Sequence, residues 1–172
     1  MANLTGGVQT FAGDTSVVDT TKMHPLGTIA RGSAGQEYMY CEGVASCLAG
    51  SWVSIGAANA LALLTTGAKG PVGVAMAALV ASTYGWVQTY GYSTIALNSS
   101  NGTVTSGGGE LSACSTVPGQ VVGQGTSTGT AAGDYIFGAF AFSGQASSAD
   151  DTLASVFLTR PFMAAAAAVA SS

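Results

Sequence analysis

Charged side chains are scarce in this sequence. Lysine and arginine number four and aspartate and glutamate number eight, so that 7% of the 172 residues are charged, against roughly 25% in an average soluble protein. Four cations and a net charge of −4 cannot neutralise a run of phosphates, which argues against nucleic-acid binding. Because 48% of the residues are hydrophobic, the composition also argues against intrinsic disorder.

The low charge predicts a surface that partners cover. A folded monomer of 16.8 kDa exposes roughly 7,600 Å², so its twelve charges leave about one per 640 Å² of surface. Much of the remaining surface would be neutral or apolar, and large apolar patches usually mark interfaces. We therefore expect contacts with other protein chains, including copies of this one.

Signals for export or for a membrane are also missing. The first ten residues, MANLTGGVQT, have neither a basic stretch nor an apolar one. The longest nearly apolar run, Pro71 to Ala81, is about half of the roughly 20 residues that cross a bilayer. Three cysteines, Cys41, Cys47 and Cys114, are an odd number. We expect reduced thiols, synthesis in a cytosolic compartment and no membrane partner.

The parts of an active site are too few. The only histidine is His24, which precedes Pro25 at a predicted turn, and no G-x-S-x-G motif occurs. A zinc site would need His24 to converge with the three cysteines, and the C-x5-C spacing of Cys41 and Cys47 is not that of a zinc finger. We predict that the protein is not an enzyme.

The carboxylates are poorly placed for acid–base work or for a metal. Glu37 and Glu42 are five residues apart and would face opposite sides of one strand. The Asp150–Asp151 pair could bind calcium with loop carbonyls, but a turn is the simpler interpretation. The glycines from Gly123 to Gly129 have the wrong spacing for a dinucleotide loop. We predict no metal and no cofactor.

Turn signals recur about every ten residues, with short β-type runs between them. This pattern predicts an all-β fold, a sandwich or barrel of short strands. We divide the chain into an extended N-terminal arm (1–23), a β domain (24–161) and a short C-terminal tail (162–172) that is helical or frayed. Two long Gly/Ser/Thr loops are expected at 98–109 and 123–133.

Individual strands can be predicted from the same pattern. Residues 24–31 and 36–42 should form a hairpin, residues 59–64 a strand or one helical turn, and Pro161 should end the last strand. The other expected strands are 51–55, 72–79, 84–92, 117–122, 134–143 and 152–160.

The clearest alternation lies between Tyr84 and Tyr92. Even positions carry Tyr, Trp, Gln, Tyr and Tyr, whereas odd positions carry Gly, Val, Thr and Gly. Side chains alternate across a strand, so one face is an aromatic stripe and the other is nearly bare. We expect the stripe to pack in the core, with a ligand platform as the alternative, and the bare face to admit a close neighbour.

Several segments resemble a known family. The runs His24-Pro25-Leu26-Gly27-Thr28 and Arg31-Gly32-Ser33-Ala34-Gly35-Gln36-Glu37-Tyr38-Met39-Tyr40 resemble the opening of the head-decoration (capsid cement) proteins of tailed bacteriophages. The segments Gly50-Ser51-Trp52-Val53, Pro71-Val72-Gly73-Val74-Ala75-Met76 and Ser82-Thr83-Tyr84-Gly85-Trp86-Val87-Gln88 are similar to later parts of that family. The likeness covers residues 24–97, and it departs at Ala34, where the family tends to have Asp or Asn.

The resemblance implies a noncatalytic, mostly β protein of the virion, often a homotrimer, that binds the major capsid protein on the capsid exterior between capsomers. We expect the arm, with Phe11, and the tail, with Phe162 and Met163, to contact neighbouring subunits. The alternative is a phage fibre-like receptor- or carbohydrate-binding module that uses the aromatic stripe or the polar loops.

Overall fold

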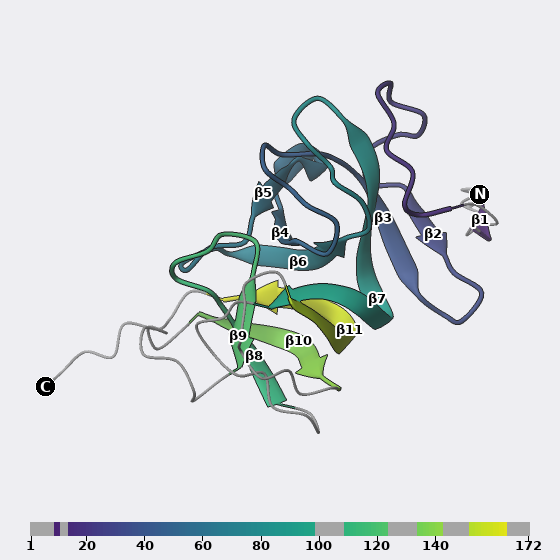
Figure 1. The fold of residues 1–172 in the computed structure, drawn as a ribbon. Helices are drawn as coiled ribbons and strands as arrows, with labels where there is room; N and C mark the ends of the chain where they lie inside the picture. Colours follow the sequence, from purple (N-terminus) through teal and green to yellow (C-terminus); the bar gives the residue numbers. More distant parts are fainter. Residues whose placement is uncertain (1–8, 11–13, 99–108, 124–133, 143–151, 165–172) are drawn as a thin grey trace, which may run out of the picture.

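The computed structural model describes residues 9–10, 14–98, 109–123, 134–142 and 152–164 (Figure 1). Within these residues the regular structure is β, apart from one 3₁₀ turn, η1 (Ala57–Asn59). The strands are β1 (Gln9–Thr10), β2 (Ile29–Arg31), β3 (Glu37–Glu42), β4 (Trp52–Ile55), β5 (Leu61–Leu63), β6 (Gly70–Ala75), β7 (Tyr84–Asn98), β8 (Gly109–Ala113), β9 (Val121–Gly123), β10 (Tyr135–Ala141) and β11 (Thr152–Met163). The all-β prediction is therefore confirmed.

The strands form one 11-stranded sheet that folds over as a sandwich does and does not close into a barrel. The long strand β7 connects its two halves (Figure 1). The start of β7 pairs with β3 and β6, whereas its end pairs with β11. We call β1–β6 with the start of β7 the upper half, and β8–β11 with the end of β7 the lower half.

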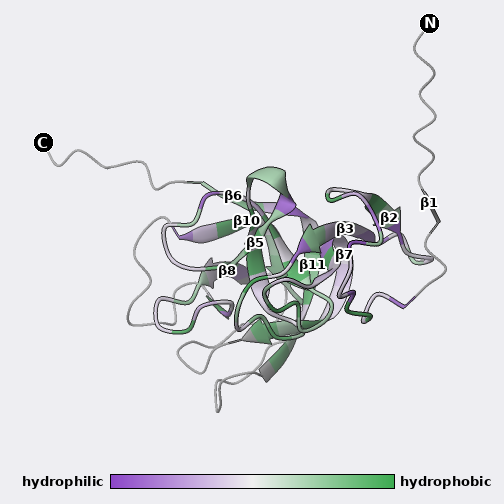
Figure 2. Ribbon diagram, turned by 90° about the horizontal axis from the view of Figure 1, so that it is seen from above, coloured by the Kyte–Doolittle hydropathy of each residue, from purple (hydrophilic) through white to green (hydrophobic). Residues whose placement is uncertain are grey.

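The core is built mainly from aliphatic side chains and alanine. In the lower half, Leu111, Val156 and Leu158 pack with Trp52 of β4, so one cluster joins the two halves. A second cluster in the upper half surrounds Val53 and Val87. Figure 2 shows that hydrophilic stretches of the ribbon are short, as the low charge requires.

The predicted hairpin is confirmed, because β2 and β3 pair antiparallel. The segment 59–64, left open between strand and helical turn, contains the end of η1 and the strand β5. The strand expected over 72–79 ends at Ala75, and only the end of 117–122 is strand. Most of the two long polar loops lies outside the described residues.

The prediction that Pro161 ends the last strand is wrong. The strand β11 continues to Met163, with Phe162 opposite Pro71 and Met163 opposite Gly70 of β6. Arg160 has a positive φ of 54°, and the resulting bend redirects β11 from β7 to β6. Residues 162 and 163 therefore belong to the β domain rather than to a helical or frayed tail.

The aromatic stripe of β7 divides between core and surface. Trp86 is buried with Tyr40, in a small cluster against which Tyr84 packs, whereas Tyr92 is exposed. The bare face does admit a close neighbour: a Cβ on Gly91, where φ is +94°, would lie 3.0 Å from the Cα of Gln36. The expectation of a packed stripe thus holds only for the start of the strand.

Candidate interaction surfaces

An unusual set of aromatic side chains covers the outer side of β7, β11 and β10. Tyr92 stands opposite Phe157, and Phe157 stands opposite Phe140, so the three share one face of the sheet. Their inward neighbours, such as Leu158 and Ala139, belong to the core. We call this surface the aromatic face. Its members are Tyr90, Tyr92, Phe137, Phe140, Phe142, Phe157 and Phe162.

The rings of the aromatic face contact one another in pairs. Phe137 stacks on Phe162 with 5.3 Å between ring centroids. Phe142 meets Tyr92 edge to face at 5.7 Å and tilts against Phe157 at 6.4 Å. These separations are those of favourable aromatic pairs, so the rings hold one another in place without being buried.

All five phenylalanines that the structure describes lie on this face, and none is buried. Phe142 is 61% exposed, whereas small and aliphatic residues such as Ala141 and Val156 fill the core beneath. A phenylalanine left in water forgoes roughly 1.5–3 kcal/mol of burial free energy. So many rings on one face are typical of a surface that another molecule covers.

An ion-pair cluster borders the aromatic face. Glu37 of β3 is buried and accepts hydrogen bonds from Arg160 Nε (3.0 Å) and Nη2 (2.9 Å) and from Arg31 Nη2 (3.1 Å). The guanidinium of Arg160 also lies over the Tyr90 ring, 5.5 Å from its centroid. Two cations against one anion leave one net positive charge at this edge.

An apolar pocket of about 260 Å³ opens between the Glu37 cluster and Phe162. Its walls include Ile29, Met39 and Val72, with Arg160 at one side. The pocket extends the apolar surface from the lower half into the upper half.

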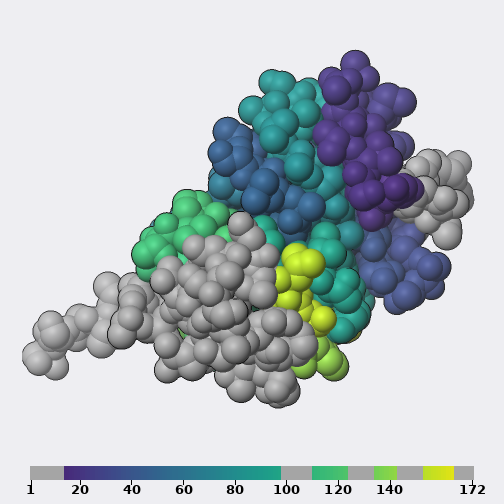
Figure 3. Space-filling model, in the orientation of Figure 1, coloured from purple at the N-terminus to yellow at the C-terminus, as the bar shows by residue number. Residues whose placement is uncertain are grey.

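A second apolar surface lies on the described part of the predicted arm. Val17, Val18 and Met23 are exposed, and the segment runs over the outside of the upper half beside β7 (Figure 3). Val17 and Met23 line a cavity of about 260 Å³ with Trp86. We call Val17, Val18 and Met23 the arm surface.

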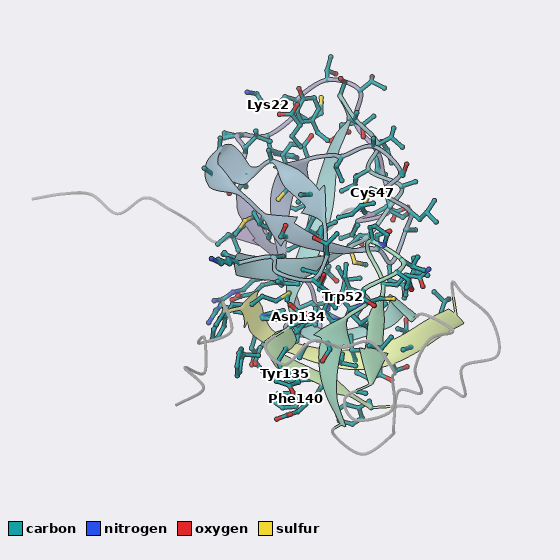
Figure 4. All side chains as sticks on the ribbon, turned by 90° about the vertical axis from the view of Figure 1, so that its left-hand side faces the viewer. Lys22, Cys47, Trp52, Asp134, Tyr135 and Phe140 are labelled. Carbon is teal, nitrogen blue, oxygen red and sulfur yellow. The ribbon has the colours of Figure 1, made fainter. Side chains whose placement is uncertain are left out.

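Hydrogen bonds hold this segment on the upper half. The backbone of Asp19 pairs with that of Tyr84, and the Asp19 carboxylate accepts a hydrogen bond of 2.6 Å from the Tyr40 hydroxyl. In Figure 4, Lys22 marks this end of the molecule and Phe140 marks the other. The arm surface and the aromatic face therefore lie at opposite ends.

The three predicted contact residues differ in their surroundings. Phe162 is exposed and stacked on Phe137. Met163 is buried in the core of the lower half, which corrects its assignment to the surface. Phe11 lies outside the described residues. The phenylalanines of β10 were not named as contact residues from the sequence, because the run FGAFAF does not alternate regularly.

The residues considered for catalysis or metal binding are packed against other side chains of the fold. The imidazole of His24 packs on Tyr40 and Trp86, with ring centroids 5.0 and 5.4 Å away. All three cysteines are buried and outside any disulfide, and burial raises the pKa of the Cys41 thiol to about 12. Among the described residues, no group of three or more His, Cys, Asp or Glu could hold a metal ion. The Asp150–Asp151 pair lies outside them.

Comparison with protein families, curated proteins and solved structures found no match. In the part of the chain that the structure describes, no helix is long and apolar enough to span a membrane. Function must therefore be inferred from the surfaces themselves.

Proposed function

We propose that this protein is a noncatalytic structural protein of a phage virion, which binds the outer surface of the capsid and stabilises it by bridging capsomers. The observation that carries the proposal is the pair of apolar surfaces at opposite ends of the β domain. A bridging protein needs at least two contact surfaces, and a charge-poor exterior suits permanent coverage.

The arm surface is the part that contacts the capsid. The arm leaves the domain beside Met23, the most exposed large apolar side chain of the described residues. Contacts that form only with the assembled shell stabilise that shell by mass action. The resemblance of residues 24–97 to capsid cement proteins supports this assignment, because the segment includes β2 to β6 and nearly all of β7, the framework that carries the arm surface.

Binding to capsids tests the proposal. Purified protein should cosediment stoichiometrically with emptied, expanded capsids of the phage whose genome encodes the chain. The double variant Val17→Ser, Met23→Ser should lose most of this binding while its circular dichroism stays that of a β protein. Leu48→Ser is the matched control, because Leu48 is as exposed as Val17 and lies outside both surfaces. Unchanged capsid occupancy of the double variant would contradict the proposal.

A phage fibre-like receptor- or carbohydrate-binding module is the second candidate. The exposed ring of Tyr92, held edge to face by Phe142, offers a platform on which a sugar could stack. A glycan array separates the two functions. Specific glycan binding that Tyr92→Ala abolishes, together with no binding to capsids, would favour the module over the capsid protein.

A further inference from the structure

We infer that the aromatic face binds the same face of a second copy of this chain about a two-fold axis. The inference goes beyond the proposed function, because it concerns self-association in the absence of a capsid. It also differs from the trimer that the family resemblance implies.

The exposed rings supply a large part of the area that a dimer needs. Phe137, Phe140, Phe142 and Phe162 are between 40% and 61% exposed. With about 200 Å² for each phenylalanine, these four alone offer roughly 400 Å². A stable interface buries about 800 Å² per partner. The four rings therefore supply about half of one side of a standard interface, and Tyr92 and the polar rim around them would supply the rest.

The charges at the edges of the aromatic face complement one another. Glu110 of β8 is exposed and stands directly opposite Phe140, so it marks one edge of the face. Arg160 marks the other edge, above Tyr90, where its cluster carries one net positive charge. Phe140 and Phe157 lie between the two edges.

A two-fold axis uses this arrangement fully. If the axis lies in the interface and runs along the strands between Phe140 and Phe157, the acidic edge of each copy faces the basic edge of the other. This attraction then acts twice, and the rings of the two copies pack across the axis. A head-to-tail ring would instead require two different surfaces that fit each other, whereas the aromatic face is a single surface whose two edges are complementary.

The mass of the purified full-length chain in solution is the first test. Light scattering after size exclusion, without capsids, should give twice 16.8 kDa at micromolar concentration. Phe140→Ser should raise the dimer dissociation constant at least tenfold, since truncated central aromatics are the costliest interface changes. Glu110→Lys should also weaken the dimer, because it places like charges at both edges. A monomer, a trimer, or a dimer insensitive to Phe140→Ser would overturn the inference.

Crosslinking tests the position of the axis. Because the native thiols are buried, a new surface cysteine can be labelled selectively. Thr159→Cys, at an exposed site on β11 two residues from Phe157 that leaves every ring in place, should form covalent dimers with a short bis-maleimide, whereas Val80→Cys, at an exposed site outside the aromatic face, should not. Equal crosslinking of the two variants would contradict the two-fold arrangement.

The two proposals can fail separately. A monomer that binds capsids through Met23 would overturn the self-pairing and leave the capsid function standing. A dimer that does not bind capsids would overturn the capsid function and leave the self-pairing standing.

Discussion

The carboxylate of Glu37 accepts two hydrogen bonds from the guanidinium of Arg160, although 123 residues separate the two in the sequence. Glu37 belongs to β3 in the upper half and Arg160 to β11, so the pair ties the halves together where β11 turns from β7 to β6. The bidentate geometry is the strongest form of such a pair, and the backbone of Arg160 is left-handed at this point, with a φ of 54°.

Glu37→Gln should therefore destabilise the fold. The variant removes the buried charge that two guanidiniums share, and a hydrogen bond to a charged group is worth about 1.5–3 kcal/mol. Because both arginine side chains are more than half exposed, we expect a loss of about 2 kcal/mol in the free energy of unfolding, measured by urea titration. Glu42→Gln, at the other end of the same strand, should cost less than about 0.5 kcal/mol. Equal losses would contradict the role of the pair.

Any side chain at position 50 should destabilise the fold strongly. Its φ is +85°, and a Cβ there would lie 1.9 Å from the carbonyl oxygen of Ile95. Gly50→Ala must shift the backbone of β7, so we expect a loss above about 3 kcal/mol, measured as a lower urea midpoint.

Gly35 is the matched control for Gly50. It has the same φ, but no atom lies within 4 Å of the position that a Cβ would take. Gly35→Ala should therefore cost only the strain of the left-handed conformation, about 1–2 kcal/mol. Equal stability of the two variants would contradict the close contact between β7 and Gly50.

Phe142 should matter little for folding, because it lies on the aromatic face. Phe142→Ser is expected to change the free energy of unfolding of the monomer by less than about 1 kcal/mol, since the ring is largely exposed. Leu158→Ala, on the inner side of β11, should cost about 2–5 kcal/mol, because the side chain is fully buried. Urea denaturation at a protein concentration well below the dimer dissociation constant measures the stability of both variants as monomers. A larger loss for Phe142 than for Leu158 would show that the face is core.

The sequence was sufficient for the fold class and for the first hairpin, because turn residues and alternation are local signals. It was insufficient at Pro161, where the local rule ends a strand but the long-range pair of Arg160 with Glu37 carries the strand on. No spacing pattern encodes an ion pair between residues so far apart.

The aromatic face was only partly predictable. The scarcity of charge indicated a covered surface, and Phe162 was selected as a contact residue. The side on which the β10 rings lie depends on the irregular register around Gly138, where φ is +77°. Alternation alone could not determine it, because a bulge moves every later side chain to the other face.

The hydroxyl of Tyr40 should make the stability of the fold fall at high pH. Burial, and secondarily the hydrogen bond to the Asp19 carboxylate, raise the pKa of Tyr40 to about 12 from the ordinary value of 10. The unfolded chain therefore releases this proton first. The contribution of Tyr40 is complete below pH 10 and is lost as the pH rises from 10 to 12.

Tyr40→Phe isolates this effect. At pH 7 the variant should lose about 1–2 kcal/mol, the value of the hydrogen bond to Asp19. Between pH 10 and 12 its stability should fall less steeply than that of the parent protein, because one titrating group is gone. Leu158→Ala is the control, since it lowers the stability without removing a titrating group and should keep the slope of the parent protein. Parallel urea midpoints for all three proteins across this pH range would show that the Tyr40 hydroxyl does not hold the arm segment on β7.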